Sequence, residues 1–187
     1  LHDALPIYEW ADKYLIATFP SRHYDIELYP AVKRHLLSFG KERLEQTGKT
    51  YSINGEKIKA RKKTHNKWFE TQDSISYWED FMRPKIIWKR IGSILRFSYD
   101  TTGNLGLDST CFATGQHMAY LWCILNSLMG HYMFKDSPKT GTGDLLVSVQ
   151  AIEPILIPMN KDMECLFENL LEEVLDRKST RLNSSHP

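Results

Sequence analysis

PKIIWKRIGSILRFSYD, residues 84–100, contains the two short apolar segments on which the fold of this chain depends. Residues 86–88 and 94–99 are rich in β-branched and aromatic side chains, which pack well on a pleated surface and predict two strands. Turn residues follow at 102–104, and residues 110–114 predict a further short strand. We therefore expect a small mixed sheet.

A helix is predicted to lie across this sheet, because large apolar side chains recur at helical spacing over residues 118–132. A strand is predicted at 145–152, an extended segment at 154–158 and an amphipathic helix at 159–175. Strands and helices in this irregular order favour the α+β class, with helices packed on the sheet. The apolar side of the first helix consists of Met118, Leu121, Trp122, Leu125, Met129 and Tyr132.

The amino-terminal third shows three local patterns. Residues 14–19 form a short apolar segment that predicts a strand. A helical pattern begins at Pro30 and closes near Gly48. Asn54 and Gly55 separate two short alternating segments, which predicts a β-hairpin with a tight turn.

The two ends do not resemble the rest of the chain. LHDALPI (1–7) and DRKSTRLNSSH (176–186) match translations of sequencing-adapter DNA, so we expect residues 1–7 and 176–187 to be adapter-derived and leave them out of the fold prediction. Residues 8–158 are then expected to form one domain, followed by a helix at 159–175 that the second junction truncates. We expect this piece to be internal to a longer reading frame.

Net charge gives no sign of a nucleic-acid partner. The 187 residues carry 24 Lys and Arg against 23 Asp and Glu, and without the two end segments the balance is 21 against 21. Any binding to nucleic acid must therefore depend on where the basic residues lie.

One segment concentrates basic residues. Six of them fall within eleven residues, directly before Trp68 and Phe69. They can contact phosphate groups or bases, or they can form a solvated rim balanced by nearby acidic residues. A second basic set flanks the predicted strands. The first set is Lys57, Lys59, Arg61, Lys62, Lys63 and Lys67, and the second is Lys85, Lys89, Arg90 and Arg96.

Catalytic and metal sites are not indicated. There is no Pro-Pro loop of the adenine-methyltransferase type, no glycine-rich strand-to-helix turn, no nucleophile elbow and no phosphate-binding loop. Cys111, Cys123 and Cys165 lack the spacing of a zinc site or a redox pair. No apolar run has the roughly 20 residues of a membrane span. We predict no catalytic residue, no metal and no cofactor in the chain itself.

A series of short motifs resembles the TaqI-like C-terminal specificity domain of adenine-specific DNA methyltransferases and fused restriction–methylation enzymes. The motifs are individually weak, and their order carries the resemblance. They are YLIATFP (14–20), Tyr29-Pro30, Ala60-Arg61 leading to Trp68, YWEDF (77–81), Pro84-Lys85-Ile86, Leu125-Asn126-Ser127 and Ile157-Pro158.

This resemblance implies that residues 8–158 are a DNA target-recognition domain, with double-stranded DNA as partner and the cytoplasm as location. A methyltransferase domain would precede it in the same chain, and S-adenosylmethionine would bind to that domain, which transfers a methyl group to a flipped adenine. The parent would be a restriction–modification or phage-defence protein. Trp88 and Trp122 are expected in the core, and Asn126 and Ser127 are expected to cap or bridge rather than to contact DNA.

Two other interpretations remain open. The first is the recognition domain of a separate specificity subunit in a multi-subunit restriction system, because such recognition domains look similar and end in a long helix. In a different class, it is a protein-interaction or scaffold domain whose basic hairpin is only a solvated rim.

Overall fold

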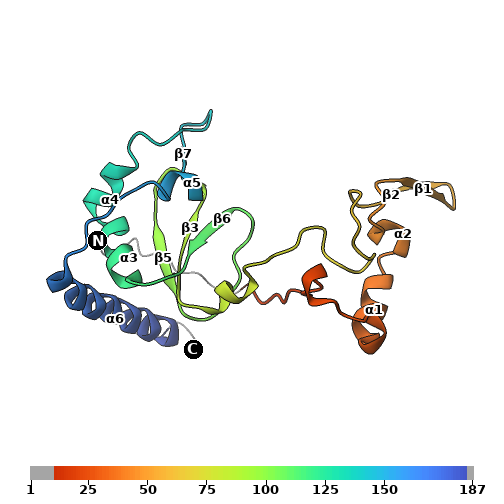
Figure 1. Ribbon diagram of the computed structural model, residues 1–187, viewed down its shortest axis with the longest axis horizontal. Coiled ribbons are helices and arrows are strands. Elements are labelled where there is room, and N and C mark those ends of the chain that lie inside the picture. Colours follow the sequence, from red (N-terminus) through yellow and green to blue (C-terminus); the bar gives the residue numbers. More distant parts are fainter. Residues whose placement is uncertain (1–10, 185–187) are drawn as a thin grey trace. The chain divides into compact units, whose positions relative to one another are not determined.

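A computed structural model describes residues 11–184, with side chains described as far as residue 177. Residues 1–7, which we predict to be adapter-derived, lie outside the described residues. The chain divides into two compact units, which we call the small unit (Ala11–Trp78) and the sheet unit (the described part of Glu79–Pro187). Figure 1 shows helices and small sheets within them, which confirms the α+β class.

The sheet unit is built on three antiparallel strands in the order β5-β3-β6. These are β3 (Lys85–Lys89), β5 (Phe97–Asp100) and β6 (Thr110–Ala113), so all three predicted strands are confirmed, although β5 begins later than expected. A second small sheet pairs β4 (Ile91–Gly92) with β7 (Leu145–Leu146). All pairings between the described strands are antiparallel, which corrects the expectation of a mixed sheet.

The helix predicted over residues 118–132 is broken into α3 (Met118–Asn126) and α4 (Leu128–Met133). Ser127 has an extended backbone, and its hydroxyl accepts a hydrogen bond from Gly130 N at 3.2 Å, so it ends one helix and caps the next. Met129 and Tyr132 are exposed as a result, contrary to their predicted place on the core face.

The core lies between one face of the sheet and α3. Trp88 and Phe97 project from neighbouring strands into the cluster that also holds Trp122 and Leu125. Both indole groups are satisfied: Trp88 Nε1 donates to Val147 O at 2.9 Å and Trp122 Nε1 donates to Phe97 O at 2.8 Å. Their predicted structural role is confirmed.

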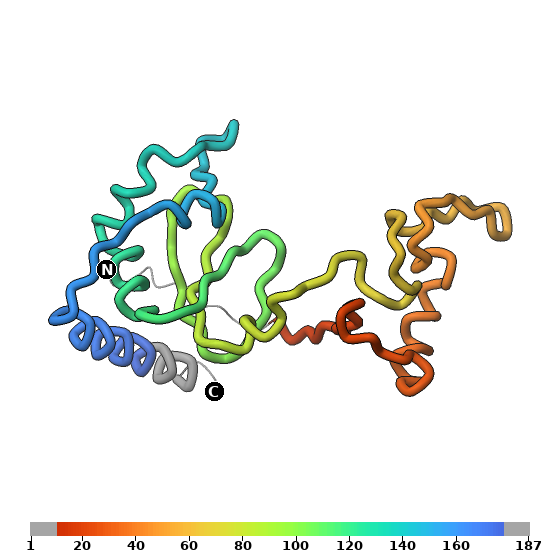
Figure 2. Tube along the Cα trace, viewed as in Figure 1, coloured from red at the N-terminus to blue at the C-terminus, as the bar shows by residue number. Residues whose placement is uncertain are grey.

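The last third of the chain adds two more helices. α5 (Val149–Ile152) replaces the second half of the strand predicted at 145–152, and residues 155–160 have no regular structure. α6 (Lys161–Ser184) packs against α3 through Leu171, and the two helices lie side by side in Figure 2. Because α6 continues past residue 175, no break in the backbone marks the predicted adapter junction, and that origin stays a prediction.

The small unit contains short helices and a hairpin. Its helical elements are η1 (Pro20–Arg22), η2 (Ile26–Leu28), α1 (Pro30–Leu37) and α2 (Lys41–Leu44). Gly40, with φ of 87°, separates the last two, so the single helix predicted from Pro30 to near Gly48 is wrong in its second half. A further short helix, η3 (Trp78–Met82), spans the residue at which the units meet in the sequence.

Residues 14–19 have no regular structure, so the strand predicted there is wrong. Thr18 is held instead by its hydroxyl, which donates to Phe69 O at 2.7 Å, while the Phe19 ring packs 5.0 Å from that of Trp78. These side-chain and loop contacts take the place of a partner strand.

The predicted hairpin is confirmed as β1 (Thr50–Ile53) and β2 (Glu56–Lys59). Asn54 and Gly55 both have positive φ, at 51° and 86°, which is the requirement of a two-residue type I′ turn. Across residues 11–184, no helix combines the length and apolar character of a membrane span.

Candidate nucleic-acid interface

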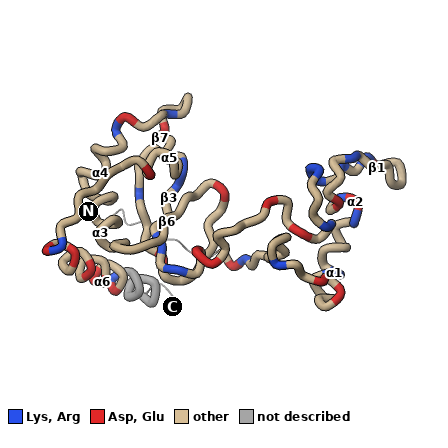
Figure 3. The backbone as a smooth tube through the Cα atoms, in the orientation of Figure 1, with Lys and Arg blue, Asp and Glu red and all other residues tan. Residues whose placement is uncertain are grey.

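Five of the six lysine and arginine residues predicted in the first basic set are exposed lysines. They lie on β2 and on the loop that follows it, and Figure 3 shows basic residues along this hairpin region of the small unit. Among the side chains that the structure describes, none of the five is ion-paired with Asp or Glu. We call them the lysine set: Lys57, Lys59, Lys62, Lys63 and Lys67.

Arg61 is different, because its guanidinium group holds the loop together from inside. Its Nε donates to Leu44 O at 2.7 Å, its Nη1 donates to Glu70 O at 3.0 Å, and its Nη2 donates to Trp68 O. Burial lowers the pKa of Arg61 from its ordinary value. All three nitrogen atoms bond to main-chain carbonyls, which gives Arg61 a structural role, and its predicted contact with DNA stays a prediction.

Two amide side chains that the sequence does not single out complete this framework. Gln46 is buried, and its Nε2 donates to the carbonyls of Lys67 and Glu70 at 3.0 and 2.8 Å. Asn66 Nδ2 donates to Thr71 O at 2.9 Å and to Gln72 O at 3.0 Å. No periodicity marks such residues, because the partners are main-chain atoms, which lie 21 and 24 residues from Gln46 and five and six residues from Asn66.

The acidic residues near the lysine set are not arranged to neutralise it. Glu70 is only 6 % exposed, and its carboxylate accepts a hydrogen bond from Lys67 N at 2.7 Å. It therefore stabilises the backbone between Lys67 and Glu70. Lys67 Nζ instead lies 5.6 Å from the centre of the Phe69 ring. The lysine set is therefore a positive surface on a loop whose main chain is fixed by other residues.

The members of the second basic set lie at opposite ends of the β3–β5 ladder and differ in exposure. Lys89, Arg90 and Arg96 are exposed, and Lys89 and Arg96 lie just beyond the pair Trp88↔Phe97 that ends the β3–β5 ladder. Lys85 lies at the other end of the ladder and is fully buried. The prediction that Lys85 contacts DNA is therefore wrong for this fold.

Lys85 has a structural role in place of that contact. Its Nζ lies 2.5 Å from Asp100 Oδ2 and donates to Phe81 O at 2.8 Å. Asp100 Oδ1 in turn accepts from the Thr102 amide and hydroxyl at 3.1 and 2.5 Å. The ion pair thus joins two strands to the turn that follows β5.

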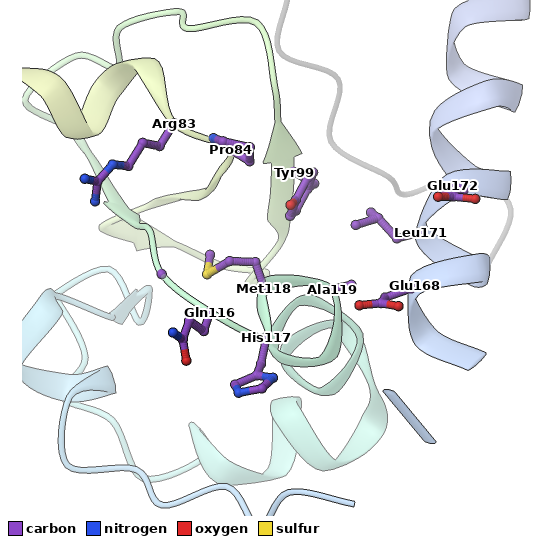
Figure 4. Close-up of a pocket in the computed structure, with 11 residues that line it drawn as sticks. Arg83, Pro84, Tyr99, Gln116, His117, Met118, Ala119, Glu168, Leu171 and Glu172 are labelled. Atoms are coloured by element: carbon purple, nitrogen blue, oxygen red, sulfur yellow. The ribbon is translucent and has the colours of Figure 1, made fainter. Parts of the chain in front are cut away.

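A cleft of about 700 Å³ opens beside α6 in the sheet unit. Figure 4 shows Glu168 and Glu172 on α6 lining it, with His117 and Arg83 contributed by other segments. The nearby Glu164 carboxylate is paired with His117 Nδ1. The acidic side chains of α6 disfavour a phosphate backbone here. Within the described residues, no three His, Cys, Asp or Glu side chains cluster as a metal site would require.

Comparison with known families gives a match. The model of the TaqI-like C-terminal specificity domain matches residues 31–152, which is more than half of the chain. The chain belongs to this family. No curated protein and no solved structure matches it.

The match to the TaqI-like specificity domain begins in α1 and ends in α5, so it includes the hairpin, the lysine set and the three-stranded sheet, and leaves α6 outside. Membership confirms the resemblance seen in the motifs. It makes the chain a target-recognition domain of restriction–modification-related proteins, with DNA as the partner. The lysine set has the charge that a phosphate backbone attracts, and its contact with DNA stays a prediction.

Proposed function

We propose that this chain is the sequence-specific recognition domain of an adenine-N6 DNA methyltransferase, either alone or fused to a restriction endonuclease, and that the lysine set contacts the duplex. The observation that carries the proposal is the lysine set itself. These five exposed cations have no acidic partners among the described side chains, and they lie on β2 and on the following loop, which Arg61 fixes, in a member of the TaqI-like family.

The wider setting is part of the same proposal. A methyltransferase domain that binds S-adenosylmethionine would precede this domain in the chain and flip the target adenine. The role of the recognition domain would be to hold the duplex through phosphate contacts and to read base edges in a groove. We place the parent protein in the cytoplasm, in restriction–modification or phage defence. The order of the motifs is the support for this setting.

A binding experiment with the full 187-residue chain tests the core of the proposal. Affinity for a duplex of about 30 base pairs with a randomised centre is measured by fluorescence anisotropy between about 50 and about 200 mM salt. We expect binding that weakens linearly with the logarithm of salt concentration, with a slope near ~0.9 per phosphate group contacted. No duplex binding at about 50 mM salt contradicts the proposal and favours a protein-interaction domain.

A pair of charge-matched variants assigns the binding to the lysine set. Lys62→Gln, Lys63→Gln and Lys67→Gln together should weaken binding and reduce the salt slope, by about 0.9 for each phosphate group that is no longer neutralised. The control removes three exposed lysines of the sheet unit, Lys135, Lys139 and Lys161, by the same change. Equal decreases in the two variants would show that net charge, and not the lysine set, determines affinity.

α6 favours a second candidate, the separate specificity subunit. Leu171 on this helix is buried against α3, yet Leu166 and Leu170 on another side are 54 % and 44 % exposed. Exposed apolar residues on a long helix suit packing against another domain or subunit. An intact reading frame distinguishes the two: a catalytic Asn-Pro-Pro-Tyr motif upstream favours the methyltransferase, and a second recognition domain after α6 favours the subunit.

A further inference from the structure

The hairpin that carries Lys57 and Lys59 has two unlike faces. Its antiparallel register places Tyr51 opposite Ile58, and these half-buried side chains share the inner face. Tyr51 is anchored there by a 3.1 Å hydrogen bond between its hydroxyl and Thr47 Oγ1. The inner face therefore fixes the orientation of the hairpin on the small unit.

The outer face is exposed, and on it each hydroxyl residue of one strand lies opposite a lysine of the other strand. Thr50 lies opposite Lys59, and Ser52 lies opposite Lys57. Directly opposite residues of an antiparallel pair have Cβ atoms about 4.5–5.5 Å apart, so each pair presents a hydroxyl group beside a cation. The structure gives none of the four side chains a hydrogen-bond or ion-pair partner among the described residues, so their donors and acceptors face solvent.

The shape of this face suits the major groove of B-form DNA. Two paired strands lie about 4.8 Å apart, and the groove is about 12 Å wide and admits a two-stranded ribbon. The type I′ turn at Asn54-Gly55 keeps the tip of the hairpin narrow and exposed. The minor groove, about 6 Å wide, is too narrow for two strands with their side chains.

The hydrogen bonds of the hairpin continue past its base, and one of them joins the β2 side to the residue that ends α2. Ala60 N donates to Lys49 O at 2.9 Å, Arg61 N donates to Glu45 O at 2.9 Å, and Gly48 N donates to Arg61 O at 2.8 Å. A ribbon fixed at its base needs little ordering when it binds, which favours specific contacts over loose electrostatic ones.

We propose that the outer face of the β1–β2 hairpin enters the major groove, where Thr50 and Ser52 read base edges while Lys57 and Lys59 contact guanine edges or phosphates. The proposal rests on the proposed function and adds the element and the groove. Serine and threonine can donate to or accept from several bases, and lysine pairs with guanine O6 and N7.

The first test compares sequence preferences. The full chain and the double variant Thr50→Val, Ser52→Ala each select duplexes from a pool with a randomised centre, and the selected sequences are compared. We expect the variant to lose roughly ten-fold or more in discrimination at one or two base positions, with its salt slope unchanged. The matched control is Thr101→Val, Ser93→Ala, two exposed residues of the sheet unit, which should leave the preference unchanged.

The outcomes separate this inference from the proposed function. If the chain binds no duplex, the proposed function itself is wrong. If the chain binds duplex with a sequence preference that Thr50→Val, Ser52→Ala leaves intact, the function stands and the hairpin inference is overturned. Thermal unfolding of both double variants should match that of the parent chain, because all four side chains are exposed.

A second test needs no variant. Bound chain should protect guanine N7, in the major groove, from dimethyl sulfate and leave adenine N3, in the minor groove, reactive. Protection of adenine N3 alone overturns the inference. An RNA duplex of the selected sequence should bind at least about ten-fold more weakly, because its major groove is too deep and narrow for a ribbon, and equal binding to RNA also overturns it.

Discussion

Lys85 Nζ lies 2.5 Å from Asp100 Oδ2, and the two residues are directly opposite each other in the β3–β5 ladder. Lys85 is fully buried, and Asp100 is 8 % exposed. Two charges removed from water in this way are stable only while both are present and their remaining hydrogen bonds are made. The ion pair therefore stabilises the fold of the sheet unit. Of the second basic set, Lys89, Arg90 and Arg96 are then the exposed members.

Asp100→Leu should destabilise the sheet unit by about 3–5 kcal/mol, because it leaves the buried Lys85 ammonium without its carboxylate. The double variant Lys85→Met, Asp100→Leu should recover most of that stability, since both charges are then absent. Denaturant unfolding measures the difference. Arg83→Gln, which removes an exposed ion pair with Asp80, is the control and should change stability by less than about 1 kcal/mol. A double variant no more stable than Asp100→Leu would contradict this account.

The stability of the sheet unit should fall in acid. Burial raises the pKa of Asp100, but hydrogen bonds from Lys85 and Thr102 outweigh that effect and hold it below its ordinary value of 3.8. Because the pKa is lower in the folded state, the stabilisation is present above about pH 4 and disappears as pH falls through the folded pKa. Unfolding free energies of the parent chain and Asp100→Asn should therefore converge below about pH 4. A constant difference down to about pH 2 would argue against it.

Arg61→Lys should weaken DNA binding although it conserves charge. A lysine cannot bond to three carbonyl groups at once, so the loop that carries the lysine set loses its support. Hydrogen bonds from a charged group contribute about 1.5–3 kcal/mol each, and we expect the stability of the small unit to fall by at least about 2 kcal/mol. Lys62→Arg, an exchange at an exposed position, is the control. If Arg61→Lys binds and unfolds like the parent, Arg61 is a simple surface cation.

The second basic set is expected to add phosphate contacts of its own. Lys89→Gln, Arg90→Gln and Arg96→Gln together should reduce the salt slope of duplex binding by about 0.9 for each phosphate group that these residues neutralise. The sequence preference should stay the same, because phosphate contacts carry no base information. Binding titrations at several salt concentrations, with the variant of Lys135, Lys139 and Lys161 as control, measure the effect. An unchanged slope would place this end of the sheet away from DNA.

Asn126→Leu should destabilise the sheet unit by about 2–3 kcal/mol, because leucine has a similar volume and leaves main-chain groups without their partner. Asn126 Oδ1 accepts from Phe97 N at 3.1 Å, and its Nδ2 donates to Phe97 O and Trp122 O at 2.9 and 3.0 Å. Denaturant unfolding measures the change. Asn169→Leu on the exposed side of α6 is the matched control, and equal effects of the two changes would contradict a bridging role for Asn126.

The elements that sequence predicts well are those that local chemistry determines. Asn54 and Gly55 specify a tight turn without help from distant residues, and the hairpin forms as predicted. The structural roles expected of Asn126 and Ser127 are confirmed as well, as a bridge and a cap. Residues 14–19 have the composition of a strand, but what they contact is a loop and an aromatic ring, and no partner strand is available among the described residues.

The candidate site was harder to predict because the sequence does not distinguish an exposed lysine or arginine from one that is buried or bonded within the fold. Lys85 directly precedes a predicted strand and Arg61 lies in a basic segment, and both look like surface cations until their partners are known. Asp100 and the carbonyl of Leu44 lie fifteen and seventeen residues away from them in sequence. Only the fold brings these partners within hydrogen-bonding distance.

The hydrogen bonds that the side chains of Arg61, Gln46 and Asn66 donate all end on main-chain carbonyls, which any amino acid would supply. The shape of the basic loop is thus independent of the exposed side chains that it carries. Mutations at those positions leave the hydrogen bonds of this framework in place. A lineage under pressure to adopt a new DNA target can therefore explore side chains here one at a time, with the framework of the loop inherited intact.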